Sequence, residues 1–331
     1  MLIAIGAISA LVLLVLASDA FTNAVEWVGA LYGLARGAVG SVIAAIGSSL
    51  PETAIAFVAL VVLRDRASQA VGIGAVLGAP FMLSTAVFAV VGIIALTRTR
   101  DSSGDCNVRV GMRSTRFGLG LFALTFALVI GASFAPTSIV RTVVAVLIVV
   151  AYVAFVTYNM RDTSPTTRAE PPPLRFSPGM RRPAPAVVFA QLTLSLCVTV
   201  FASHWFVTSL AAASTAFGIA PLVLSLFLSP IATELPELLN VVIWMRRGLD
   251  DYAVGNVIGA MMFQTSIASA IALLATPWVI DRFAYTAAIA TFAAVIIVLC
   301  VSQMRDHLNS WALTACGILY VVYLWYAIAT H

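Results

Sequence analysis

The chain has 331 residues, of which 61% are hydrophobic and only 10% are charged, and its formal net charge is +4. Soluble domains are typically about 45–50% apolar and about 25% charged. The composition therefore excludes a water-soluble globular domain, a disordered chain and a nucleic-acid-binding protein, and it predicts that most of the chain lies in lipid.

Apolar runs separated by polar residues predict an all-α polytopic membrane protein with about ten transmembrane helices. One helical span takes about 20 residues, so ten spans leave room only for short loops. The first run has no basic segment before it and no clear cleavage site, so we interpret it as a span rather than a signal peptide. The predicted spans cover residues 2–31, 37–63, 69–96, 114–132, 137–159, 185–213, 219–245, 252–275, 284–303 and 309–329.

A stretch rich in Pro and Arg, residues 161–184, separates the fifth predicted span from the sixth. Such a stretch cannot form a membrane span, because Pro interrupts helices and each Arg is costly in lipid. We predict a linker at 161–184 between a five-span unit at 1–160 and a second five-span unit at 185–331.

The distribution of Arg predicts the orientation of the chain, since cytoplasmic loops carry an excess of basic residues. With the N-terminus outside, the predicted inner loops hold 14 Arg and the outer loops hold 4. We therefore expect an integral protein of the plasma or inner membrane, with its N-terminus outside and the 161–184 linker in the cytoplasm.

The two units share polar motifs at a regular spacing. Residues 47–52 read Gly-Ser-Ser-Leu-Pro-Glu, and residues 232–237, which lie 185 positions later, read Ala-Thr-Glu-Leu-Pro-Glu. Farther along, residues 74–78 (Gly-Ala-Val-Leu-Gly) resemble residues 255–259 (Gly-Asn-Val-Ile-Gly) at an offset of 181. Since each unit has an odd number of spans, the two insert with opposite topology. Inverted repeats are typical of secondary transporters that bind substrate near the midplane.

Three carboxylates, Glu52, Glu234 and Glu237, lie inside predicted apolar spans. A charged group at the bilayer centre costs at least about 2.5–3.5 kcal/mol unless it is compensated. The Arg residues lie at predicted loops, so an internal ion pair is not expected. Bound metal cations or titrating protons remain as the compensating charge.

A proline precedes a glutamate in each motif, at Pro51 and at Pro236. Because proline lacks an N–H and clashes with the carbonyl four residues earlier, we expect the helices to break near residues 47 and 232, just before Glu52 and Glu237. The freed carbonyls would join carboxylates and hydroxyls as hard oxygen ligands, which suit Ca²⁺, Na⁺, Mg²⁺ or Mn²⁺ rather than Zn²⁺ or Cu⁺. The hydroxyl candidates are Ser48, Ser49 and Thr233.

These motifs resemble those of the cation/calcium antiporter superfamily, the sodium/calcium exchanger group. That family carries two inverted repeats, each with a Gly-Ser/Thr-Ser-x-Pro-Glu motif followed by Gly-Asn-x-x-Gly-Ser-Asn-x-x-Asn/Asp, and the similarity covers nearly the whole chain. The resemblance implies alternating-access exchange of Ca²⁺ for Na⁺ or H⁺ at one central site. It also implies that Glu52 and Glu237 are the principal Ca²⁺ ligands and that Ser48, Ser49 and Thr233 help to bind the ions.

The chain departs from the family pattern at several ligand positions. Ala79 and Leu83 stand where the first repeat has Ser and Asn, and Ala260 and Gln264 stand where the second has Ser and Asp. Glu234 replaces the Ser that precedes Leu-Pro-Glu. We expect Na⁺ coupling, with an H⁺-coupled divalent-cation exchanger that uses Glu52, Glu234 and Glu237 as the alternative.

Other classes of protein fit the sequence less well. A cation channel would not need inverted broken helices, and no enzyme motif or nucleotide-binding loop supports a catalytic function. We expect inorganic cations as transported substrates, membrane lipid as the surroundings, and no resident cofactor.

Further polar residues in the spans are weaker candidates. Asn240, Asn256 and Gln264 could add amide oxygens to the site, and Asn256 could cap a broken helix. Asp19 and Glu26 could line an ion path or lie solvated at the interface, and His204 could relay protons or simply pack.

Overall fold

The computed structural model describes residues 2–31, 49–98, 107–134, 137–160, 172–180, 182–304 and 307–330, and this part of the chain is almost entirely helical. It contains one isolated β-bridge, between Val108 and Leu308, and no strand. The α-helices are α1 (Leu2–Leu31), α3 (Leu50–Phe57), α4 (Arg66–Met82), α5 (Phe88–Thr97), α6 (Met112–Gly131), α7 (Ser138–Met160), α8 (Pro185–Phe217), α9 (Pro221–Thr233), α10 (Leu235–Arg246), α11 (Asp250–Phe263), α12 (Ser269–Ala275), α13 (Arg282–Gln303) and α14 (Ser310–Ala329).

Four short segments have other helical geometries. The π-helical segments η1 (Val58–Leu63), η2 (Leu83–Val87) and η4 (Gln264–Ala268) each follow an α-helix without a break, and η3 (Ala132–Phe134) is a 3₁₀ turn. The segments η2 and η4 begin 181 residues apart, which is the offset between the two glycine motifs. The internal repeat therefore extends to a shared π segment, a feature that often marks functional sites.

Eight helical stretches of the described chain are long and apolar enough to cross a membrane. They confirm the predicted all-α polytopic membrane protein. Two further apolar helices, Leu50–Leu63 and Pro221–Pro230, are shorter. These two fall within predicted spans 37–63 and 219–245, the ones that were expected to contain broken helices. The total of ten spans and the opposite orientation of the two units remain predictions.

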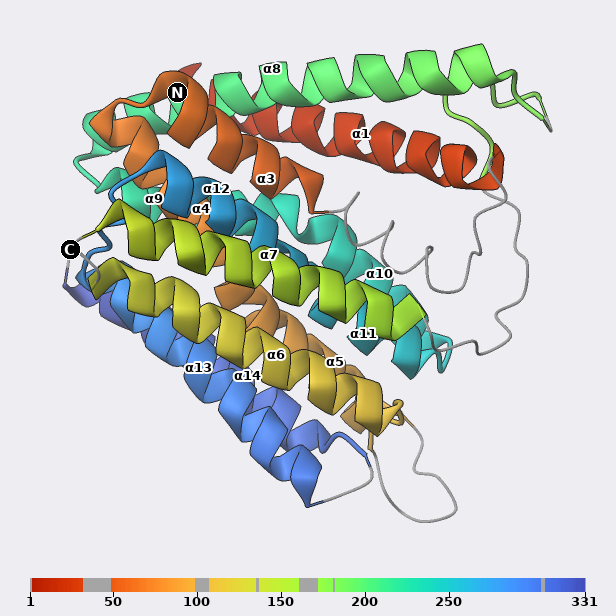
Figure 1. Ribbon diagram of the computed structural model, residues 1–331, viewed down its shortest axis with the longest axis vertical. Coiled ribbons are helices and arrows are strands. Elements are labelled where there is room, and N and C mark those ends of the chain that lie inside the picture. The colour runs from red at the N-terminus through yellow and green to blue at the C-terminus, as the bar shows by residue number, and fades with distance from the viewer. Residues whose placement is uncertain are drawn as a thin grey trace.

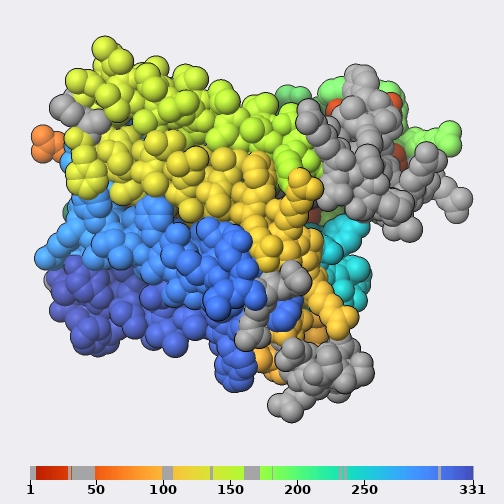
Figure 2. Space-filling view, turned by 60° about the horizontal axis from the view of Figure 1, so that its bottom comes forward, coloured from red at the N-terminus to blue at the C-terminus, as the bar shows by residue number. Residues whose placement is uncertain are grey.

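The most deeply buried long helices lie at the centre of the molecule (Figure 1). The stretch from α4 through η2 to α5 is 72% buried over its most apolar part, and the stretch from α11 through η4 to α12 is 83% buried. Around them lie α6, α7, α13 and α14 on one side, and α1 and α8, side by side, on the other. The peripheral helices expose aliphatic side chains to lipid; Figure 2 shows one such face, formed by α7, α6 and α13, and the exposed residues of α7 include Ile139, Val143, Val146 and Val150.

Small residues bring α4 of the first unit against α9 of the second. A Cβ at Gly74 would lie 2.7 Å from the carbonyl oxygen of Leu222, and a Cβ at Gly78 would lie 2.6 Å from that of Leu226. Ser225 Oγ also donates a hydrogen bond of 2.6 Å to the Val71 carbonyl. This small-residue interface joins the two units directly beside the end of α9.

Loops at one end of the bundle are joined by polar contacts to the start of α11. Arg98 forms an ion pair of 2.8 Å with Asp250, whose carboxylate also accepts a hydrogen bond from the Arg109 N–H. Asp251 accepts one from the Gly111 N–H at 2.6 Å. The segment after α5 is therefore attached to the second unit.

Candidate functional site

The first half of the candidate site is the N-terminus of α3. Ser49 is the residue before the helix, and its carbonyl accepts hydrogen bonds from the N–H of Thr53 at 3.4 Å and from its hydroxyl at 3.0 Å. Pro51 lies in the first turn, where its missing N–H leaves no helical hydrogen bond unmade. Ser49 is fully buried and Glu52 is 2% exposed. The helix thus begins with a buried carboxylate in its first turn.

The second half is the junction of α9 and α10, which repeats this arrangement. Glu234 is the residue between the two helices: its N–H donates to the Pro230 carbonyl, and its own carbonyl accepts from the Leu238 N–H, both at 2.9 Å. Thr233, Glu234 and Glu237 are fully buried. Glu237 is the third residue of α10, as Glu52 is of α3. The two glutamates therefore occupy equivalent places in two helix first turns.

The break in the second unit was predicted two residues too early. α9 continues to Thr233, and the interruption lies at Glu234 rather than near residue 232. Glu237 lies three residues beyond this interruption. The reason is that proline is best tolerated in the first turn of a helix, so the new helix starts immediately before the proline and the chain turns there.

Helix N-termini carry a partial positive charge, because the first N–H groups of the helix have no partners within it. This charge favours an ionised carboxylate at Glu52 and at Glu237. Glu52, Glu234 and Glu237 also lie within electrostatic range of one another, so a bound cation would relieve the repulsion between their charges. The cluster therefore attracts cations.

Gln264, the first residue of η4, connects the two halves of the site. Its Nε2 donates to Glu234 Oε1 at 2.6 Å and approaches Ser49 Oγ at 3.4 Å. One amide thus reaches the residues that precede both α3 and α10. The residue that occupies the same place in η2 is Leu83, so this polar connection exists only in one unit.

Several polar atoms in α3, α9, α11 and η4, and at the junction of α9 and α10, are buried and make no hydrogen bond within the described chain. Leaving such an atom unpaired costs about 1–3 kcal/mol, so a cluster of them indicates a binding site for a polar ligand. They comprise both carboxylate oxygens of Glu52, Glu234 Oε2, Gln264 Oε1, Thr265 Oγ1, Ser266 Oγ, Ser229 Oγ and Asn256 Nδ2.

Within the described residues, no three His, Cys, Asp or Glu side chains form a group that could hold a metal ion. A cation in this arrangement would therefore take one or two carboxylates together with hydroxyl, amide and carbonyl oxygens. That ligand chemistry suits Ca²⁺ and Na⁺, which bind oxygen in flexible geometries.

The remaining predicted ligands lie at different depths. Ser48 falls outside the described residues. Asn240, one turn after Glu237, is only half-buried. Asn256 is 4% exposed, but the prediction that it caps a broken helix is wrong, because α11 runs without interruption from Asp250 to Phe263. A Gly-Asn pair within an apolar run was not enough to end the helix, since no proline accompanies it.

Two of the weaker candidates lie away from the cluster. Asp19 is exposed and forms an ion pair with Arg175, which supports the interfacial interpretation rather than the ion path. His204 is exposed on the outer surface of α8, which does not support a relay into the site.

Sequence reasoning missed two hydroxyl side chains that come directly after Gln264, those of Thr265 and Ser266. Both are fully buried, and both lie in the π segment. A run of Gln-Thr-Ser inside an apolar span was the available signal. A π segment widens the helix by one residue per turn and changes which side chains face the interior, and the sequence does not reveal it.

Comparison with known proteins matches the chain to one family. The family model described as sodium/calcium exchanger protein matches residues 2–161 and 187–329. Among curated proteins, the Escherichia coli inner membrane protein YrbG is 26% identical over 283 residues, which cover 83% of this chain and 81% of YrbG. The putative antiporter CaxA of Alkalimonas amylolytica is 30% identical over 119 residues, which cover 34% of this chain and 37% of CaxA.

Solved structures share the fold at low sequence identity. The H⁺/Ca²⁺ exchanger CAX has a TM-score of 0.75 and 16% identity, covering 97% of this chain and 81% of CAX. The sodium–calcium exchanger NCX_Mj, soaked with Na⁺ and Sr²⁺, has a TM-score of 0.59 and 18% identity, covering 98% of both chains. Both resemblances concern the fold of the whole chain rather than one part of it.

Proposed function

The chain belongs to the sodium/calcium exchanger family, and from that premise we propose that it exchanges Ca²⁺ for Na⁺ by alternating access at the Glu52–Glu234–Glu237 cluster. The observation that carries the proposal is the pair of buried carboxylates in the first turns of α3 and α10. Gln264 hydrogen-bonds Ser49 and Glu234, the residues that precede these two helices. The chain is an integral membrane cation transporter of the antiporter type, and no enzymatic step is part of the proposal.

Glu52 and Glu237 are the proposed Ca²⁺ ligands. Two carboxylates neutralise one Ca²⁺, and helix N-termini favour the ionised form of the carboxylate that a hard cation requires. Hydroxyl and amide oxygens of Ser49, Thr233 and Gln264 would complete the shell, and Ser48, Asn240 and Asn256 are further proposed contributors.

The same charges explain why transport would be an exchange rather than a leak. A cluster of buried, ionised carboxylates without a cation is expensive, because each charge has lost its hydration and repels the others. A change between inward-facing and outward-facing states is therefore favourable only when cations occupy the site. Ca²⁺ leaving on one side must then be replaced by other cations before the return step.

Na⁺ is the proposed counter-ion, on the strength of the family and of the structural similarity to NCX_Mj. Glu234 supplies a charge where the family has a Ser, and Gln264 supplies an amide oxygen beside it. The alternative is H⁺ coupling. It is supported by the structural similarity to CAX and by the replacement of family Na⁺ ligands by Ala79, Leu83 and Ala260.

We propose the topology that the Arg distribution favours, with the N-terminus outside and residues 161–184 in the cytoplasm. The two units, 1–160 and 185–331, would then be inverted repeats with the carboxylates near the midplane. The relative YrbG is described as an inner membrane protein, which supports an inner-membrane location for this chain.

The test is ⁴⁵Ca²⁺ uptake into proteoliposomes with an outward Na⁺ gradient, an outward H⁺ gradient, or neither. Uptake driven by Na⁺ alone is the expected result. Uptake driven by H⁺ alone would establish the alternative coupling. Uptake without either gradient would indicate a channel, and the absence of Ca²⁺ uptake under all three conditions would contradict Ca²⁺ exchange.

A further inference from the structure

Helices α1 and α8 form a long antiparallel pair at the edge of the molecule (Figure 1). At one end, a Cβ on Gly6 would lie 3.4 Å from Ser209 Oγ, and at the other Gln191 Nε2 donates to the Ala20 carbonyl at 2.8 Å. The most apolar stretches of the two helices are only 28% and 33% buried. The two helices pack much more extensively against each other than against the rest of the described chain.

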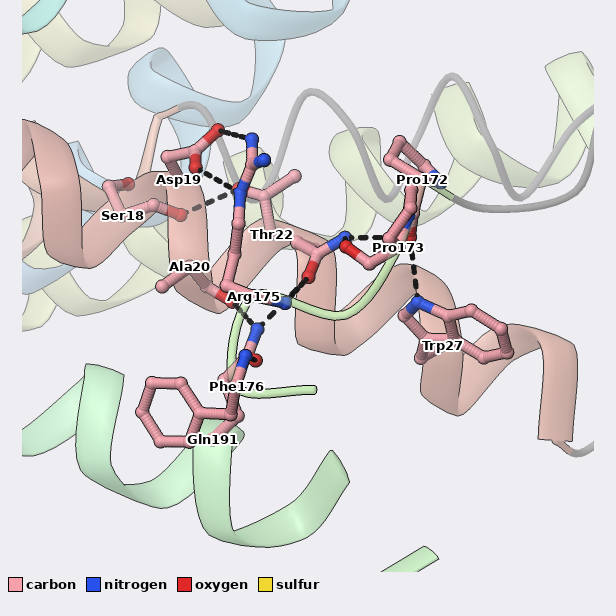
Figure 3. A network of polar contacts seen from close by, with 11 residues as sticks. Ser18, Asp19, Ala20, Thr22, Trp27, Pro172, Pro173, Arg175, Phe176 and Gln191 are labelled. Carbon is pink, nitrogen blue, oxygen red and sulfur yellow. Dashed lines mark hydrogen bonds and ion pairs between the residues drawn. The ribbon is translucent and has the colours of Figure 1, made fainter. Parts of the chain in front are cut away.

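The segment Pro172–Phe176, which precedes α8 and which we call the strap, lies against both helices (Figure 3). On α1, Asn23 Nδ2 donates to the carbonyls of Pro172 and Pro173 at 3.2 and 3.4 Å, and its Oδ1 accepts from the Arg175 N–H at 3.0 Å. Trp27 Nε1 donates to the Pro172 carbonyl at 2.9 Å. The strap is thus recognised through its backbone.

On α8, the buried amide side chain of Gln191 also forms a hydrogen bond with the strap. Gln191 Oε1 accepts from the Phe176 N–H at 2.8 Å, and Gln191 Nε2 reaches Asn23 Oδ1 at 3.1 Å. Asn23 is 4% exposed and Gln191 is fully buried. Both donors of Asn23 end on strap carbonyls, so withdrawal of the strap would leave these buried N–H groups without their partners.

Two side chains of the strap add to this attachment. Leu174 is fully buried. Arg175 forms a two-point ion pair with Asp19 of α1, at 2.9 and 3.2 Å, which raises the pKa of the guanidinium. Adjacent prolines hold the backbone extended before docking, which lowers the entropy lost on binding. These are the properties of a bound peptide rather than of a passive connection.

We propose that the strap is an intramolecular ligand which clamps α1 to α8 and fixes their alignment. Within the described residues, the hydrogen bonds between the strap and other elements all involve α1 or α8. Because α1 and α8 both pack against α3 and α9, the clamp also holds the helices that border the carboxylate cluster. The proposal that the strap clamps the two helices depends only on the contacts described above. The expected effect of the clamp on the rate of Ca²⁺ transport rests on the proposed exchange function.

The alignment is measured by the distance between spin labels at Val12 of α1 and Phe201 of α8, two exposed positions, in a cysteine-free chain. The undocking variant combines Leu174→Ser with Arg175→Glu. Arg182→Glu, a change of an exposed arginine outside the strap, is the matched control. A third variant, Asp19→Arg with Arg175→Glu, restores an ion pair of reversed polarity.

We expect a narrow distance distribution in the native chain, in the control and in the reversed pair, and at least a twofold broader one in the undocked variant. In flux assays the undocked variant should lose at least fivefold in Ca²⁺ turnover, with half-saturating Ca²⁺ changed less than twofold, because the strap does not touch the site. An unchanged distance distribution overturns the clamp. A broadened distribution with native turnover overturns its role in transport. Should the native chain move no Ca²⁺, the exchange proposal fails while the distance measurement still decides the clamp.

Discussion

Substitution of Gly78 by Ala tests whether the close contact of α4 with α9 positions the site. The new Cβ would lie 2.6 Å from the Leu226 carbonyl oxygen and 2.8 Å from Pro230 Cγ, whereas ordinary contact begins at 3.4 Å. The α9 backbone must therefore withdraw by about 0.8 Å. Overpacking of this kind typically costs about 1–3 kcal/mol. Pro230 lies one turn before Glu234, so the withdrawal would also displace the break between α9 and α10.

Gly120→Ala in α6 is the matched control, because a Cβ there meets nothing within 4 Å. Both substitutions gain the same helix propensity of about 1 kcal/mol, so the difference between them isolates the contact. We expect Gly78→Ala to be less stable in detergent than Gly120→Ala by about 1–3 kcal/mol, which would appear as a lower melting temperature. We also expect Gly78→Ala to lower Ca²⁺ flux at least tenfold. Equal stability and equal flux of the two variants would refute the reasoning.

Three further substitutions probe separate features. Gln264→Leu, which copies the residue at the same place in η2, should raise the half-saturating concentration of the counter-ion at least tenfold, because Glu234 loses its hydrogen bond; an unchanged ion dependence in flux assays would contradict this. Asp65→Ala should cost about 1 kcal/mol of thermal stability by removing the cap on the Ser68 N–H. Since hydrogen bonds from Ser68 lower the Asp65 pKa below 3.8, this contribution is complete at neutral pH and disappears as the pH falls through the lowered pKa, so melting curves of the two proteins should converge there. Asp250→Ala should cost about 2 kcal/mol, because Arg98 loses its ion pair and the Arg109 N–H loses its charged acceptor; unaltered melting would refute the role of this contact.

The sequence was sufficient for the membrane class and for the two Pro-Glu motifs, because lipid permits few polar residues and each of them is conspicuous. Pro51 and Pro236 predicted two interruptions. The first, near residue 47, falls outside the described residues, and the second lies two residues later than predicted because proline prefers the first turn of the following helix. The hydrogen bonds of Gln264 could not be foreseen, since they join residues 30 and 215 positions apart and depend on how the two units pack.

The strap was the least predictable element. Pro172 and Pro173 predicted a stretch that does not form a span, and the described residues 172–180 and 182–184 form no helix. Composition does not show whether such a stretch is free or bound. Its binding depends on Asn23 and Gln191, two amides of different apolar helices that lie 168 positions apart in the sequence.

The central claim is that the carboxylates of Glu52 and Glu237 hold the transported Ca²⁺. Its most direct test is Ca²⁺ binding to the purified protein by calorimetry, compared between the native chain, Glu52→Gln, Glu237→Gln and the exposed control Asp65→Asn. We predict that either glutamine variant folds and inserts but weakens Ca²⁺ binding at least a hundredfold, while the control binds as the native chain does. Native affinity in either glutamine variant would contradict the account.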